Sequence, residues 1–190
     1  MRKSILTCIN TIIFASLLSS CASNITYHLP EFFDKEYLNY KTSVKPIDLM
    51  ADNYCPATRA LHVIGKDMRN NPYTVYSNAG VAYTITPSDY TIMVAEYMED
   101  KLRESNLQVN EITGDEIHIW MEAVHADGTF TFGCDVQLRI SIPDINYTNI
   151  YIGHEGGPII MNAIGYATNL AINNFLEDPV VQKYLKCQND

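Results

Sequence analysis

The segment 129–142, "TFTFGCDVQLRISI", alternates polar and apolar side chains without a break. Successive side chains of a β-strand point to opposite faces, so this pattern predicts a strand with one buried and one solvent-facing side. The buried side is expected to carry Phe130, Phe132, Cys134, Val136, Leu138, Ile140 and Ile142. A strand this long needs neighbouring strands and a second layer that covers its apolar face.

The flanking segments supply those neighbours. Ile117, Ile119, Met121 and Ala123 alternate with polar residues, and Asp127-Gly128 predicts a tight turn into the next strand. The sequence "YTNIYIGH" (147–154) predicts a further strand after the turn at 143–146, and "LHVI" (61–64) predicts the first one. After the strand at 61–64 and before the first main helix, two β-prone runs around Ser77–Gly80 indicate a hairpin or a long loop.

Two main helices complete the second layer. The first is expected to begin at Thr86, whose hydroxyl can cap free amides, with Pro87 in its first turn. Its apolar side chains recur at helical spacing: Tyr90, Val94, Tyr97, Met98 and Leu102. The second helix is expected over 158–176, followed by a short one that ends near Lys186. The order predicts an α+β, two-layer fold: an antiparallel or mixed sheet of about four strands with two main helices on one face.

The N-terminus has the pattern of an export signal. Arg2 and Lys3 precede an apolar run, 5–18, that is shorter than the about 20 residues a spanning helix needs. The residues Leu18-Ser19-Ser20-Cys21 then resemble the lipobox of bacterial lipoproteins. This resemblance implies that residues 1–20 are removed and that Cys21 is acylated, which anchors the chain in a membrane. The absence of Asp after Cys21 resembles outer-membrane sorting, with the protein on the periplasmic face.

Composition limits the partners of the exported chain. Loss of Arg2 and Lys3 reduces 13 basic residues to 11 against 22 acidic ones, a formal charge of −11. A chain this acidic is a poor ligand for nucleic acid or for an anionic lipid surface. We therefore expect contact with outer-membrane lipid only through acylated Cys21, and protein partners rather than nucleic acid.

The domain plan and the cysteines follow from this export route. Residues 21–56 show no sustained period and are expected to form a lipidated N-terminus and tether, and residues 57–187 a single α+β domain. Export permits disulfides. Because Cys134 lies at a buried strand position, Cys55 and Cys187, which flank the domain, are the better candidates for a disulfide.

Several short phrases resemble a known family. They are the Asp67-Met68-Arg69 element after the first strand, "LRESNLQV" at the end of the first main helix, and the closing "NFLEDPVVQKYL". With the lipobox and the order of the elements, residues 57–186 resemble the YajG-like outer-membrane lipoproteins, in a wider group that includes auxiliary lipoproteins of envelope transporters. The resemblance implies a non-enzymatic part of an envelope machine.

No pattern in the residues predicts catalysis. His118 lies on an outward strand face, His125 and Asp127 flank a turn, and "GHEGGP" lacks the Lys and Ser or Thr of a phosphate-binding loop. No Cys and His spacing is typical of a metal site. We expect no catalytic residue, no metal and no cofactor.

A binding surface is better indicated. Between Ile140 and Leu176 only Asp144 and Glu155 carry a fixed charge, and depletion of charge with aromatic residues is typical of interface cores. Two groups of side chains are the candidates: outward-facing Trp120 with His118, and an uncharged polar stripe on the second helix formed by Asn162, Tyr166, Asn169 and Asn173. The alternatives are a solvated neutral face for the stripe and cover by the tether for Trp120.

Two functions remain open at this point. The first is a structural or accessory subunit of an outer-membrane secretion, transport or assembly complex. The alternative is a carrier that binds lipid or envelope glycan in an apolar groove.

Overall fold

The computed structural model describes residues 25–29, 60–110 and 112–186. Its main sheet has four strands in the order β2-β5-β6-β7. Neighbouring strands are antiparallel except for β2, which lies parallel to β5, so the sheet is mixed. The strands are β2 (Leu61–Gly65), β5 (Asp115–Gly128), β6 (Phe132–Ile142) and β7 (Tyr147–Gly157).

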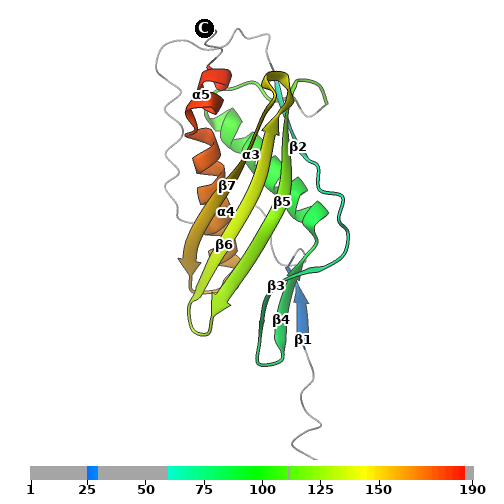
Figure 1. The fold of residues 1–190 in the computed structure, drawn as a ribbon, viewed down its shortest axis with the longest axis vertical. Helices are drawn as coiled ribbons and strands as arrows, with labels where there is room; N and C mark the ends of the chain where they lie inside the picture. Colours follow the sequence, from blue (N-terminus) through cyan, green and yellow to red (C-terminus); the bar gives the residue numbers. More distant parts are fainter. Residues whose placement is uncertain (1–24, 30–59, 111, 187–190) are drawn as a thin grey trace, which may run out of the picture.

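Two helices cover one face of this sheet, as the sequence predicts (Figure 1). Helix α3 (Pro87–Glu104) packs on β2 and β5, and α4 (Ile160–Leu176) packs on β6 and β7. The short helix α5 (Pro179–Leu185) follows α4. The predicted α+β, two-layer fold is therefore confirmed. No helix within the described ranges is long and apolar enough to cross a membrane.

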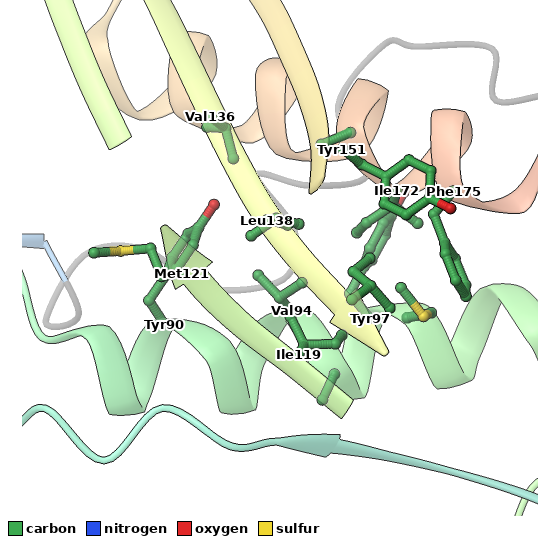
Figure 2. Packing of buried hydrophobic residues seen from close by; sticks show 14 of the residues in the cluster. Tyr90, Val94, Tyr97, Ile119, Met121, Val136, Leu138, Tyr151, Ile172 and Phe175 are labelled. Atoms are coloured by element: carbon green, nitrogen blue, oxygen red, sulfur yellow. The ribbon is translucent and has the colours of Figure 1, made fainter. Parts of the chain in front are cut away.

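The core lies between the helices and the main sheet. Figure 2 shows Tyr90, Val94 and Tyr97 of α3 facing Ile119 and Leu138 of the sheet. All five predicted apolar positions of α3 are buried: Tyr90, Val94, Tyr97, Met98 and Leu102. The hydroxyl groups of Tyr90 and Thr168 lie 2.6 Å apart and link α3 to α4 inside this core.

A second, three-stranded sheet lies at the end of the molecule where α3 begins (Figure 1). Its order is β1-β4-β3, formed by β1 (Ile25–His28), β3 (Tyr73–Asn78) and β4 (Val81–Ile85). The pair β3–β4 is a hairpin, one of the two predicted forms. The sequence does not predict β1, which pairs in parallel with β4, stacks Tyr27 on Tyr83 and leads into buried Leu29.

Strand β5 differs from its predicted alternation because it contains a bulge. The register with β6 shifts between Met121 and Ala123, so Glu122 is the extra residue. Beyond it, Val124 and Ala126 are buried instead of Ala123. Strand β6 begins at Phe132 rather than at residue 129, and Phe130 is 93% exposed in the turn, so its predicted burial is wrong.

Polar contacts that the sequence does not specify join the end of β1 to the end of β4 and to the start of α3. The Thr86 hydroxyl makes no capping bond to α3. It lies 3.0 Å from His28 Nε2, while His28 Nδ1 lies 3.0 Å from the Thr84 hydroxyl. The expected capping role of Thr86 is therefore wrong, because His28 of β1 takes this hydroxyl group.

Small residues allow α4 to lie very close to β7. A Cβ atom added at Gly153 would meet the Ala167 carbonyl oxygen at 1.8 Å and the Ala171 nitrogen at 2.8 Å. Ala163, Ala167 and Ala171 recur every four residues along this side of α4 and are fully buried. The small side chains therefore let the backbones of α4 and β7 pack almost directly on each other.

Candidate functional site

The face of the main sheet opposite the helices is the candidate site, and we call it the outer face. Strand register places its members in rows across the strands. One row is Trp120, Arg139 and Ile150, and the next contains Gln137 and Ile152. On the other side of the first row, His118 lies between Ile64 and Ser141. Both predicted interaction residues of the sheet, Trp120 and His118, therefore lie together on this face.

Trp120 is held in place by a cation. The Arg139 guanidinium carbon lies 4.7 Å from the centre of the Trp120 ring, within range of a cation–π interaction. Arg139 Nε also donates to Glu122 Oε1 at 2.7 Å, so the residue of the β5 bulge orients the guanidinium group. Trp120 thus presents an aromatic ring whose orientation is limited before any partner binds.

His118 also contacts the Trp120 ring. Its imidazole lies edge-on to Trp120, with ring centres 5.7 Å apart and an angle of 82° between the planes. His118 Nε2 also contacts Glu116 Oε2. The hydrogen bond to His118 lowers the pKa of the Glu116 carboxyl group, and Lys66 adds a weaker lowering effect. His118 therefore orients Trp120 and lies in a polar cluster, rather than acting as an isolated surface group.

Two apolar side chains complete the outer face at its edge. Ile150 and Ile152 of β7 are 48% and 52% exposed. The sequence "YTNIYIGH" contains the signal that would identify them: an isoleucine stands on the face opposite to buried Tyr151, where a solvated strand normally carries polar residues. Trp120 is among the interaction residues predicted from the sequence, whereas these two isoleucines are not.

Further along the face, Asp135 lies between two histidines. His125 is its neighbour on β5 and His154 its neighbour on β7. His154 Nδ1 lies 2.6 Å from Asp135 Oδ1, and this hydrogen bond raises the pKa of the exposed imidazole. Among the described residues, no group of three His, Cys, Asp or Glu side chains is placed to hold a metal ion.

The polar stripe of α4 does not form a surface. Asn162 and Asn169 are 9% and 1% exposed, whereas Tyr166 and Asn173 are partly buried. Burial raises the pKa of Tyr97 on α3, and the adjacent Asn169 side chain counteracts part of this rise. Asn162 and Asn169 are therefore not available as part of the predicted binding surface, because α4 is enclosed on more sides than an ordinary surface helix.

The Asp67-x-Arg69 element has a structural role. Asp67 is 8% exposed, and its Oδ1 accepts hydrogen bonds from the backbone nitrogen and Nε of Arg69 at 3.1 and 2.9 Å. Asp67 Oδ2 accepts the Met121 N–H at 3.3 Å, and Arg69 donates to the Met121 carbonyl oxygen. The hydrogen bonds from Arg69 lower the pKa of Asp67. The pair therefore replaces strand hydrogen bonds where β2 has ended and β5 bulges.

The remaining predicted site residues concern cysteine chemistry. Cys21, Cys55 and Cys187 lie outside the described residues. Cys134 is buried as predicted and has a free thiol. Burial raises the pKa of this thiol to about 12, so it stays protonated and unreactive near neutral pH.

The geometry defines a two-layer α+β fold, and among the described residues both main helices pack on the same face of the main sheet. No family model matches the chain, and no curated protein matches it. A solved structure of a Xanthomonas campestris protein assigned to family DUF330 is similar at a TM-score of 0.41 and 12% identity, over 71% of this chain and 91% of that one. A similarity this distant identifies neither a shared fold nor a shared function.

Proposed function

We propose that this chain is a non-enzymatic, lipid-anchored subunit of an envelope complex at the periplasmic face of the outer membrane, and that it contacts a protein partner through the outer face. The lipobox at Leu18–Cys21 supports the anchor. The observation that carries the contact is the Trp120 ring, stacked by Arg139 beside exposed Ile150. This chemistry suits a protein surface, because Trp and Arg dominate the residues on which binding energy concentrates.

The arrangement of the outer face lowers the cost of binding. Ordering a flexible side chain at an interface costs about 0.5–1.5 kcal/mol. Here Glu122 already orients Arg139, and Arg139 with His118 already limits the Trp120 ring. Much of this ordering therefore precedes the arrival of a partner. The adjacent isoleucines add apolar area that burial would remove from water.

The carrier function receives less support. A carrier of acyl chains needs an apolar groove, whereas four of the ten residues that line the groove beside β2 are charged: Glu96, Glu99, Asp100 and Arg103. Between helices and sheet, buried side chains from both layers contact one another (Figure 2). Lipid extracted from the purified protein, in stoichiometric amount by mass spectrometry, would favour the carrier instead.

The anchor is tested separately from the contact. Cells that express the chain are labelled with palmitate, and the Cys21→Ser variant is compared with the unchanged sequence. We expect label in the unchanged chain only, and release of the variant from the membrane fraction. Unlabelled protein, or a Cys21→Ser variant that stays equally membrane-bound, would contradict the anchor.

The contact is tested by native electrophoresis of detergent-solubilised membranes. The unchanged chain should migrate in a discrete assembly larger than itself. Trp120→Ala should weaken the contact by about 2 kcal/mol, the size expected for a central interface tryptophan, and so release the free chain. Ile112→Glu is the control, since Ile112 is 84% exposed but lies outside the outer face. An assembly that survives Trp120→Ala as well as it survives Ile112→Glu would argue against this surface.

A further inference from the structure

The edge of the main sheet at β2 adjoins a groove that the proposed function does not use. The groove has a volume of about 430 Å³ and lies between β2 and α3. The strand contributes His62, Val63, Ile64 and Gly65, and the helix contributes apolar Ile92 and Ala95 with four charged residues: Glu96, Glu99, Asp100 and Arg103. Both a strand edge and a helix wall therefore border the same space.

The backbone of β2 has hydrogen-bonding groups that face this groove. Lys66, just beyond the strand, donates its N–H to Ile119 of β5 at 2.8 Å. The backbone groups of Leu61 point away from β5. Its N–H donates to the Gln108 carbonyl oxygen and its carbonyl oxygen accepts from the Asn110 N–H, both at 2.9 Å. Backbone groups of alternate residues point to the same side of a strand. Val63 and Gly65 therefore direct their backbone groups away from β5.

The chain itself shows that this edge accepts a strand. Val109 forms a parallel bridge with Leu61, so residues 108–110 already pair with the first position of β2. The pairing stops there, because the Asn110 side-chain oxygen accepts the N–H groups of Ile112 and Thr113 at 3.0 and 3.2 Å and turns the chain away. Beyond this bridge the edge from Val63 to Gly65 adjoins the groove.

A carboxylate occupies the next backbone position. Glu99 of α3 is 6% exposed, and its Oε1 accepts the Val63 N–H at 3.1 Å. Its Oε2 accepts from Arg103 at 3.2 Å. The carboxylate oxygen thus stands where the carbonyl oxygen of an added strand would accept the same N–H.

Charge indicates the kind of strand that fits. The groove has three acidic side chains, Glu96, Glu99 and Asp100, against Arg103 and one histidine. Arg103 already pairs with both Glu99 and Asp100. Glu96 is exposed, and no ion pair joins it to another residue of the described ranges. A ligand with a basic side chain would complement this excess of negative charge.

We propose that the groove between β2 and α3 binds an extended peptide segment with a basic side chain, which adds as a strand to the β2 edge. The peptide backbone pairs with Val63 and Gly65, as in other complexes formed by strand addition. A peptide carbonyl oxygen replaces Glu99 Oε1 at the Val63 N–H, and the released carboxylate pairs with the basic side chain. An apolar neighbour in the peptide packs on Ile92, which is 51% exposed. This site does not depend on the lipid anchor or on the outer face.

The test uses the full chain in detergent and a phage library of random twelve-residue peptides. We expect selected sequences to contain Lys or Arg between β-branched residues. Glu96→Lys should weaken their binding about tenfold, equivalent to about 1.4 kcal/mol. Glu177→Lys makes the same charge change at an exposed position after α4 and should leave binding unchanged. Circular dichroism of both variants checks that they are folded.

A second readout locates the peptide. On binding, the amide signals of Val63 and Gly65 should shift in NMR spectra, and their hydrogen exchange should slow, because an added strand covers these amides. Selected peptides that bind Glu96→Lys as well as Glu177→Lys, or that leave the two amides unchanged, would overturn the proposal, as would failure to select any groove-dependent peptide. Self-association lost in Glu96→Lys would assign the groove to a second copy and also overturn it.

Discussion

Asp178 joins the edge of the main sheet to the end of the helical layer. Its Oδ1 caps α5 by accepting the N–H of Val180 at 2.8 Å. Its Oδ2 accepts the hydroxyl groups of Tyr147 and Tyr151, both from β7, at 2.7 and 3.0 Å. One carboxylate therefore connects β7 with α5, and its removal tests how much this connection stabilises the fold.

We expect Asp178→Ala to lower the free energy of unfolding by about 3 kcal/mol. Loss of a helix cap costs about 1 kcal/mol. A hydrogen bond to a charged group contributes roughly 1.5 kcal/mol or more, but the two tyrosine hydroxyls are 2.9 Å apart and can partly compensate each other. Asp178→Asn keeps a capping oxygen for α5, but an NH2 group, which donates, replaces the Oδ2 atom that accepts the two hydroxyl groups. Its loss should therefore be about 2 kcal/mol, the total without the loss of the cap.

The assay is urea unfolding at pH 7 followed by circular dichroism. The midpoint should fall in the order unchanged chain, Asp178→Asn, Asp178→Ala, with the slope unaltered. Equal midpoints for the two variants would refute the separate contribution of the cap. A loss below about 1 kcal/mol in Asp178→Ala would refute the account of the carboxylate as a shared acceptor.

The same residue predicts a dependence on pH. Burial favours the neutral form, but hydrogen bonds from Tyr147, Tyr151 and the α5 backbone outweigh it and lower the pKa of Asp178 below its usual 3.8. A lowered pKa in the folded state stabilises the protein above the unfolded-state pKa, and this stabilisation is lost as pH falls through the folded-state value. The difference between the unchanged chain and Asp178→Ala should therefore shrink below about pH 4.

Three further outcomes follow from the packing and the outer face. Gly153→Ala should lower the free energy of unfolding in urea by about 1–3 kcal/mol, because α4 must move away from β7. Gly156→Ala is the control: its added Cβ comes no closer than 3.3 Å to Phe132, so stability should change by less than about 0.5 kcal/mol. Equal effects of the two substitutions would contradict the close approach of α4 to β7. Tyr90→Phe should cost about 1 kcal/mol through loss of the buried contact with Thr168, and an unchanged midpoint would show that this contact adds nothing. NMR titration should give the His154 imidazole a pKa above the usual 6.5, and Asp135→Asn should lower this pKa. The attraction between protonated His154 and Asp135 stabilises the fold below about pH 6.5 and is lost as pH rises through the folded-state pKa. A His154 pKa that Asp135→Asn leaves in place would rule out this pairing.

Local periodicity predicts the layers of this fold because burial acts on each element separately. The alternation of β6 identifies Cys134, Val136 and Leu138 as core residues, and the structure buries all three. The helical spacing of α3 identifies its packed face equally well. Both elements are long, so each repeats its pattern often enough to be distinguished from chance.

Features that depend on distant partners could not be predicted in this way. Strand β1 has four residues and exists through pairing with β4, whose first residue, Val81, faces Ile25. The bulge at Glu122 depends on register with β6, and the alternation of β5 alone gives no sign of it. Asn169 is polar and in a helix, yet its partner Tyr97 lies on another helix. In each case tertiary contacts override a local pattern.

The outer face was predictable in part. Alternation along β5 places Trp120 and His118 outward, but the cross-strand row that adds Arg139 and Ile150 requires the register of three strands. The groove beside β2 could not be predicted from the sequence at all, because it depends on the parallel placement of β2 and on the angle at which α3 crosses it.

Site-specific photo-crosslinking in cells tests the outer face most directly as a contact surface. A photoreactive phenylalanine analogue replaces Ile150 or Ile152, and Ile112 serves as the exposed control away from this face. We predict one discrete adduct with an envelope protein from both outer-face positions, absent at Ile112 and reduced by Trp120→Ala. Adducts at Ile112 alone, or no adduct from Ile150 and Ile152, would contradict a partner on this face.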